Sequence, residues 1–183
     1  MLELFLSGEF NQLKFLLSLN PMKYKNDMVR SILKTSKIYD AKIDVAPNNL
    51  YKYVLKQLYV DKLGTIEGYL IDENKLSELY GIHLGELANY GMLSGKFSDA
   101  VNNARKGAKY APDNCWVQIQ LAHALLLSGE SASAYKIYDS TRTKQNEDGF
   151  ECSKICIEQI DYFIEQGITH PDFQKIIFLL QQK

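Results

Sequence analysis

The sequence repeats itself between residues 81 and 141. Residues 81–114 read GIHLGELANYGMLSGKFSDAVNNARKGAKYAPDN, and residues 115–141 read CWVQIQLAHALLLSGESASAYKIYDST. Ser-Gly recurs with Gly95 and Gly129, which are 129 − 95 = 34 residues apart, and Leu87-Ala88 and Ala100 recur at the same offset. Three matches at one period are typical of a repeat architecture.

Each repeat has the pattern of two helices joined by a turn. Apolar residues recur at helical spacing, and Gly95 and Gly129 stand where a left-handed residue can end a helix. One hairpin cannot cover its own apolar face, so the hairpins must stack. The pattern predicts four helices: Ile82–Leu93, Phe97–Tyr110, Asp113–Leu127 and Ser131–Ser140. Small residues that let paired helices approach closely are expected at their crossings: Ala88, Ala100, Ala122 and Ala134.

Residues 81–141 resemble two tetratricopeptide repeats. The residues that match the family pattern are Leu87, Ala88, Ala100, Pro112, Leu121, Ala122, Ala134 and Tyr138. The sequence departs from that pattern at Gly91, Gln118 and Asn146. The resemblance implies an all-α fold, a right-handed solenoid of antiparallel helical hairpins.

A second resemblance is carried by Tyr135–Tyr138, a polar connection, a long helix and Glu165–Phe173. This succession is similar to the closing segment of many bacterial tetratricopeptide proteins, which implies a longer helix followed by a short capping helix. Gly167 is placed to end the longer helix. The last helix has one apolar face, which should lie on the helix before it: Phe173, Ile176, Ile177 and Leu180. The expected organisation is therefore residues 81–141 as two repeats and residues 142–183 as capping helices.

Residues 1–80 are interpreted as degenerate helical repeats or an N-terminal helical region. Helices are expected at Phe10–Leu19, Lys25–Tyr39 and Pro47–Val60. Residues 64–74 favour irregular helix or loop, with a short strand at Ile66–Ile71 as the alternative. The residues expected to face inward are Met28, Val29, Ile32 and Leu33 in the second helix, and Tyr51, Val54, Leu55 and Leu58 in the third.

Charge and composition exclude several classes of function. The net charge is −1, with 21 basic and 22 acidic residues interspersed, whereas nucleic-acid binding needs a basic face. No apolar run is long enough for membrane insertion, and the start lacks the pattern of a signal peptide. Three cysteines, an odd number, argue against a disulfide framework and for a reducing, cytoplasmic location. An exported protein supplied without its leader would look the same.

Few residues suggest chemistry. Cys152 and Cys156 lie four apart on a predicted helix and could hold a metal with His123 or His170, and His123 could pair with Cys115 or Cys152 as a nucleophile. No motif supports either arrangement, and there is no phosphate loop or nucleophile elbow. We therefore expect small core cysteines, no catalytic residue, no metal, no cofactor and no enzyme.

In the family that this sequence resembles, the first helices of successive hairpins line a concave groove. The residues predicted to bind a partner there are Asn89, Met92, Trp116, Ile119, Gln120 and His123. The expected function is a non-catalytic protein-protein interaction module, an adaptor, scaffold or chaperone-like protein that binds a helix or extended peptide. The alternative is a regulatory or sensing C-terminal domain of a larger bacterial protein. Trp116 could instead pack against the loop before Pro112, and His123 is expected to make binding sensitive to pH.

Overall fold

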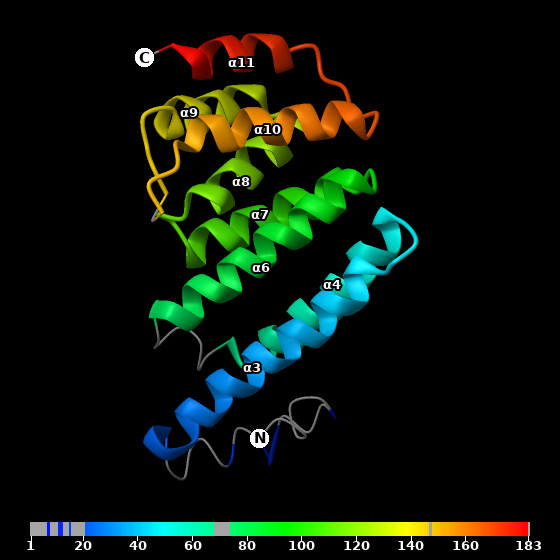
Figure 1. Ribbon diagram of the computed structural model, residues 1–183, viewed down its shortest axis with the longest axis vertical. Helices are drawn as coiled ribbons and strands as arrows, with labels where there is room; N and C mark the ends of the chain where they lie inside the picture. The colour runs from blue at the N-terminus through cyan, green and yellow to red at the C-terminus, as the bar shows by residue number, and fades with distance from the viewer. Residues whose placement is uncertain are drawn as a thin grey trace. The chain divides into compact units, whose positions relative to one another are not determined.

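The computed structural model describes residues 21–67, 74–146 and 148–182, together with residues 7, 11, 12 and 15. In these ranges the chain forms helices and turns without a strand, apart from an isolated bridge between Gln145 and Glu151 (Figure 1). The predicted all-α class is confirmed. The helices are α3 (Pro21–Asp44), α4 (Asn49–Gly64), α6 (Asn74–Leu93), α7 (Phe97–Tyr110), α8 (Cys115–Leu127), α9 (Ser131–Thr141), α10 (Cys152–Glu165) and α11 (Phe173–Gln181).

The chain divides into an N-terminal unit, Met1–Tyr80, and a C-terminal unit, Gly81–Lys183, with the boundary inside α6. No helix in the described ranges is both long and apolar enough to cross a membrane. The expected helix at Phe10–Leu19 and most of the alternative strand at Ile66–Ile71 lie outside the described residues.

Three helices of the C-terminal unit end in the same way, at the glycines that the sequence singled out. Gly95, Gly129 and Gly167 have φ of 73°, 91° and 79°, values that favour glycine. At the first turn Gly95 N–H donates to Met92 and Lys96 N–H donates to Gly91, at 3.0 and 2.8 Å. These paired bonds satisfy carbonyl groups that the end of a helix leaves open, and each turn is thereby fixed by local sequence.

Helix α8 is buried on every side. It contacts α7, α9 and α10, and nearly every residue from Cys115 to Leu126 is buried or half-buried. A helix that is apolar all round belongs in a core. The four crossing alanines, Ala88, Ala100, Ala122 and Ala134, are all fully buried, as expected.

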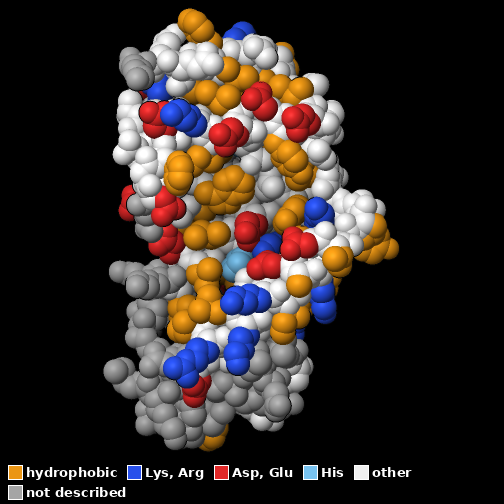
Figure 2. Space-filling model, in the orientation of Figure 1, with side chains coloured by type: hydrophobic (Ala, Val, Ile, Leu, Met, Phe, Trp, Pro, Cys, Tyr) orange, Lys and Arg blue, Asp and Glu red, His pale blue; other side chains and the backbone are white. Residues whose placement is uncertain are grey.

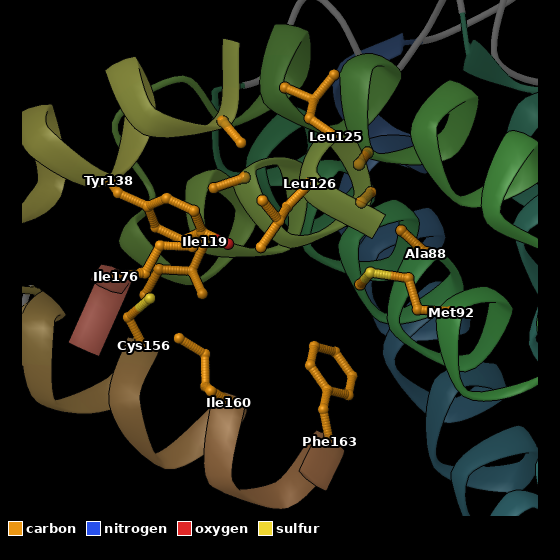
Figure 3. Packing of buried hydrophobic residues seen from close by; sticks show 14 of the residues in the cluster. Ala88, Met92, Ile119, Leu125, Leu126, Tyr138, Cys156, Ile160, Phe163 and Ile176 are labelled. Carbon is orange, nitrogen blue, oxygen red and sulfur yellow. The ribbon is translucent and has the colours of Figure 1, made fainter. Parts of the chain in front are cut away.

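The C-terminal helices close this core. Figure 3 shows Cys156, Ile160 and Phe163 pointing from α10 toward the side chains of α8, and all three are 0 % exposed. Helix α11 contacts α9 and α10. Phe173 and Ile176 are buried on its inner face, so the last helix lies on the helix before it, as expected.

In the N-terminal unit, α3 and α4 pack against each other. The Tyr59 hydroxyl donates to the Ile32 carbonyl at 3.3 Å, and the buried Lys56 ammonium lies 3.1 Å from the Asp40 carboxylate. Helix α4 begins at Asn49, two residues later than expected. The Asn48 side chain caps it by accepting the Tyr51 N–H at 3.0 Å.

The expected inward faces of these two helices need correction. On α3, Met28 and Ile32 are buried as expected, but Leu33 is 45 % exposed and Val29 is half-buried. On α4 the expected face is wrong: Tyr51, Val54 and Leu58 are 58 %, 46 % and 50 % exposed, and Leu55 is half-buried. The buried face of α4 is formed instead by Tyr53, Lys56, Tyr59, Val60 and Leu63.

Helices α6 and α7 approach most closely where glycine faces glycine. A Cβ at Gly107 would lie 2.9 Å from the Gly81 carbonyl oxygen, and a Cβ at Gly81 would lie 2.6 Å from the Ala111 Cβ. These distances are too short for a side chain, so the backbones can approach this closely only without one.

We predict that Gly107→Ala destabilises the protein although alanine is the better helix former. Helix propensity alone would stabilise α7 by about 1 kcal/mol, but overpacking against the α6 backbone should lower the free energy of unfolding by roughly 1–3 kcal/mol. Urea denaturation measures the difference, and Asn102→Ala at an exposed site of the same helix is the control. A Gly107→Ala variant more stable than wild type would contradict the close packing of α6 and α7.

Candidate functional site

The residues predicted to line an open groove lie largely inside the core. Met92, Ile119, Gln120 and His123 are 0 % exposed. Asn89 and Trp116 are half-buried. Four of the six predicted partner-binding residues are therefore buried in this structure, whereas Asn89 and Trp116 keep part of their surface.

The chain's own helix α10 packs against two of these residues, Asn89 and His123. The Gln159 amide of α10 donates to the Asn89 side chain at 3.2 Å. The Phe163 ring meets the His123 ring edge to face, with centroids 5.2 Å apart. The cause is the apolar stripe of α10, in which Cys156, Ile160 and Phe163 recur at helical spacing and need an apolar surface to cover them. The surface of α8 that the sequence assigned to a partner satisfies that need.

His123 is the centre of a buried polar cluster. Its Nδ1 shares a hydrogen bond of 2.8 Å with the Tyr138 hydroxyl, and its Nε2 lies 3.9 Å from the Cys156 Sγ. Burial lowers the pKa of His123 to about 3 and raises the pKa of both the Cys156 thiol and the Tyr138 hydroxyl. All three groups are therefore neutral near pH 7. The arrangement favours a packed hydrogen-bonded core over an activated thiolate, which needs a lowered pKa.

Gln120 lies one turn before His123 and is also fully buried. Neither its amide nitrogen nor its oxygen has a hydrogen-bond partner in the described part of the chain. The side chain faces α6, because a Cβ added at Gly85 would lie 3.8 Å from the Gln120 Cγ.

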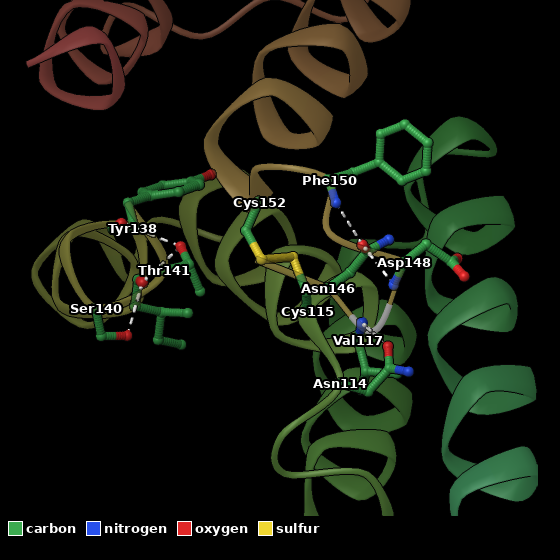
Figure 4. Close-up of a disulfide and its surroundings, with 11 residues drawn as sticks. Asn114, Cys115, Val117, Tyr138, Ser140, Thr141, Asn146, Asp148, Phe150 and Cys152 are labelled. Atoms are coloured by element: carbon green, nitrogen blue, oxygen red, sulfur yellow. Dashed lines mark hydrogen bonds between the residues drawn. A yellow bond between two sulfur atoms is a disulfide. The ribbon is translucent and has the colours of Figure 1, made fainter. Parts of the chain in front are cut away.

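The structure joins Cys115 to Cys152 in a disulfide, which sequence reasoning did not expect (Figure 4). The two Cα atoms are 6.0 Å apart and 37 residues apart in sequence. The bond links the first residue of α8 to the first residue of α10. A cross-link over a loop of this length can stabilise a fold by roughly 4 kcal/mol through the unfolded state. A metal site at Cys152 and Cys156 would require both as thiolates, and the disulfide removes Cys152 from that pair.

The exposed face of α4 is the feature that sequence reasoning missed. Leu50, Tyr51, Val54 and Leu58 are each between 46 % and 58 % exposed. They lie on one side of the helix, since their spacing follows helical periodicity. The opposite side is buried and mostly apolar, with Tyr59, Val60 and Leu63 beside the paired Lys56, so α4 has two apolar faces where an ordinary surface helix has one.

The sequence contained a signal for the two apolar faces of α4. Helix α4 has apolar residues on two faces, one through Tyr51, Val54 and Leu58, and another through Tyr59 and Leu63. Periodicity alone cannot choose between two apolar faces. The pairing of Lys56 with Asp40 on α3 decides the orientation, and that pairing joins residues on two different helices.

Charged side chains are distributed unevenly over the view in Figure 2. Lys and Arg gather over α3, where Arg30, Lys34 and Lys37 are exposed. Acidic side chains lie over α10, where Glu158 and Asp161 are exposed. The exposed apolar row of α4 is therefore the candidate surface.

Comparison with protein-family models, with curated proteins and with solved structures finds no match. The site is therefore defined by the geometry of this chain alone.

We predict that His123 makes the stability, rather than partner binding, depend on pH. The folded pKa of about 3 lies below the usual value of about 6.5, so between these two values the unfolded state binds more protons. The stabilising effect is complete above pH 6.5 and is lost as the pH falls, by up to roughly 1.4 kcal/mol per pH unit.

Urea denaturation at several pH values between 7.5 and 5 measures this slope. The His123→Gln variant should show a smaller slope than wild type. His170→Gln, which removes a histidine outside the core, is the control for the loss of a histidine as such. Equal slopes for wild type and His123→Gln would show that the ring is accessible and protonates in the folded state.

Proposed function

We propose that this protein is a non-catalytic protein-interaction module of the tetratricopeptide type, with its docking surface on the outer face of α4. Four of the six predicted groove residues are buried, and the proposal therefore places the docking surface elsewhere. The C-terminal unit supplies a rigid, closed scaffold.

The exposed apolar row of α4 supports this proposal. A soluble protein tolerates single exposed apolar residues, but several adjacent ones on one face mark an interaction surface. Tyr51 is well suited to such a surface, because an aromatic side chain buries much area and loses few rotamers. Leu50, Val54 and Leu58 extend the face over more than two turns of the helix.

The repeat pattern supports the family assignment. The 34-residue period coincides with helices α7 and α9, which begin just after the equivalent glycines Gly95 and Gly129. Helix α7 has the predicted bounds, Phe97–Tyr110, and α8 and α9 differ from prediction by one or two residues. Helix α6, in contrast, begins at Asn74, which is 82 − 74 = 8 residues before the predicted start at Ile82, so the agreement with the repeat length of this family rests on α7, α8 and α9.

The location of the protein bears on its redox state. A disulfide such as Cys115–Cys152 persists in oxidising compartments and is reduced in most cytosols. We propose a cytoplasmic location from the sequence, which predicts that Cys115 and Cys152 are reduced in the cell. An oxidised pair would favour the exported location that the sequence left open.

Affinity capture tests the function. Tagged wild type and a Val54→Glu, Leu58→Glu variant are used as baits in a lysate of the source organism, with mass spectrometry of the captured proteins. A charge buried in an apolar interface is costly, so the partners of wild type should be reduced at least roughly tenfold on the variant.

Ile38→Glu on α3 is the matched control, since Ile38 is 40 % exposed and lies outside the α4 face. It should retain the partners. If the α4 variant keeps its partners while Trp116→Ala loses them, the binding surface is the remaining accessible part of the predicted groove and the α4 proposal is wrong.

A further inference from the structure

The outer face of α4 has the spacing of a coiled-coil seam. Tyr51, Val54, Leu58 and Asp61 follow one another by three, four and three residues. This alternation is the heptad pattern that brings one helix against another. The buried residues of α4 occupy the remaining positions of the heptad. Every position that would meet a second helix is thus at the surface, while the opposite side of α4 is buried and α4 packs against α3.

We propose that a second copy of this chain occupies this face, with the two α4 helices packed antiparallel about a two-fold axis. The proposal rests on the α4 docking surface proposed above and names its partner. In this register Val54 packs against Leu58 of the second copy, and Leu58 against its Val54. A two-fold contact of this kind needs a self-complementary surface.

The polar residues of the seam determine the direction of pairing. In the antiparallel register with Val54 opposite Leu58, the next seam residues on either side are Tyr51 and Asp61. Tyr51 therefore lies opposite Asp61 of the second copy. The Tyr51 hydroxyl can then donate to that carboxylate, which already accepts the Gln57 amide through Oδ1 at 2.7 Å. A parallel pairing would instead set Asp61 against Asp61, and like charges repel.

The charge of the helix ends favours the same direction. The first turn of α4 has no acidic residue, although the N-terminus of a helix carries a partial positive charge. In the antiparallel pair Asp61 of each copy lies near the first turn of the other α4. The first turn of each α4 is thereby placed near a negative charge of the other copy, and it has no acidic residue of its own.

The size of the face predicts a weak association. A helix of 16 residues is about 24 Å long. A pair of such helices buries an area at the lower end of specific interfaces, about 1,000 Å² in total. We therefore expect a dimer with a dissociation constant in the micromolar range, populated at high local concentration.

Sedimentation equilibrium of the purified full-length chain, from low micromolar to several hundred micromolar, tests the proposal. Wild type should shift from monomer to dimer over this range. Val54→Glu should weaken dimerisation at least roughly tenfold, and Ile38→Glu should leave it unchanged. Circular dichroism and thermal melting establish that both variants are folded.

Disulfide cross-linking tests the register of the two α4 helices directly and does not depend on a substitution that weakens the dimer. Under mild oxidation, a mixture of Val54→Cys and Leu58→Cys chains should form a disulfide-linked dimer faster than either variant alone. Faster cross-linking of Val54→Cys with itself would indicate parallel pairing and overturn the proposal. A wild-type chain that stays monomeric at several hundred micromolar, or a dimer unaffected by Val54→Glu, would also overturn it.

These outcomes also separate the dimer from the proposed function. If the chain is monomeric but the α4 variant still loses its captured partners, the docking surface stands and its occupant is a different protein. If the chain is monomeric and capture is unaffected by the α4 substitutions, both proposals fail.

Discussion

The requirement that α8 be covered on every side governs the C-terminal unit. Helix α8 has apolar residues on every face, and apolar surface left in water costs free energy, so α7, α9 and α10 all pack on it. The small residues at the crossings, the neutral His123 and the inward stripe of α10 all follow from this requirement. The disulfide from Cys115 to Cys152 ties the first residue of α10 to the first residue of α8, and so reinforces the contact that closes the core.

The parts of the fold that could be predicted from sequence are those that local interactions determine. The bounds of α7 and the glycine turns at Gly95, Gly129 and Gly167 depend on residues within a few positions of each other. The burial of the crossing alanines follows from the repeat itself. In each of these cases the sequence pattern and the packing require the same structure.

The incorrect predictions share a different cause. Whether His123 is accessible depends on α10, whose Cys156 and Phe163 lie far along the chain from it. The family resemblance implied that the first helices of the hairpins line an open groove. In the structure the apolar stripe of α10 packs on part of that surface instead. The orientation of α4 likewise depends on a pairing between Lys56 and Asp40 on a different helix. A buried lysine is costly unless its charge is paired, and local periodicity carries no information about that partner.

The two units therefore differ in how they use apolar surface. The C-terminal unit hides the surface predicted for a partner, and the N-terminal unit exposes a surface predicted to be core. The central claim is that α10 is an integral part of the core that encloses α8. Native-state hydrogen exchange tests this claim directly, because it measures the free energy needed to open each helix. The account predicts that the backbone amides of His123 in α8 and Ile160 in α10 exchange with the same free energy, equal to that of global unfolding. Exchange in α10 at a much lower free energy, with α8 still protected, would show that α10 opens independently and would contradict the claim.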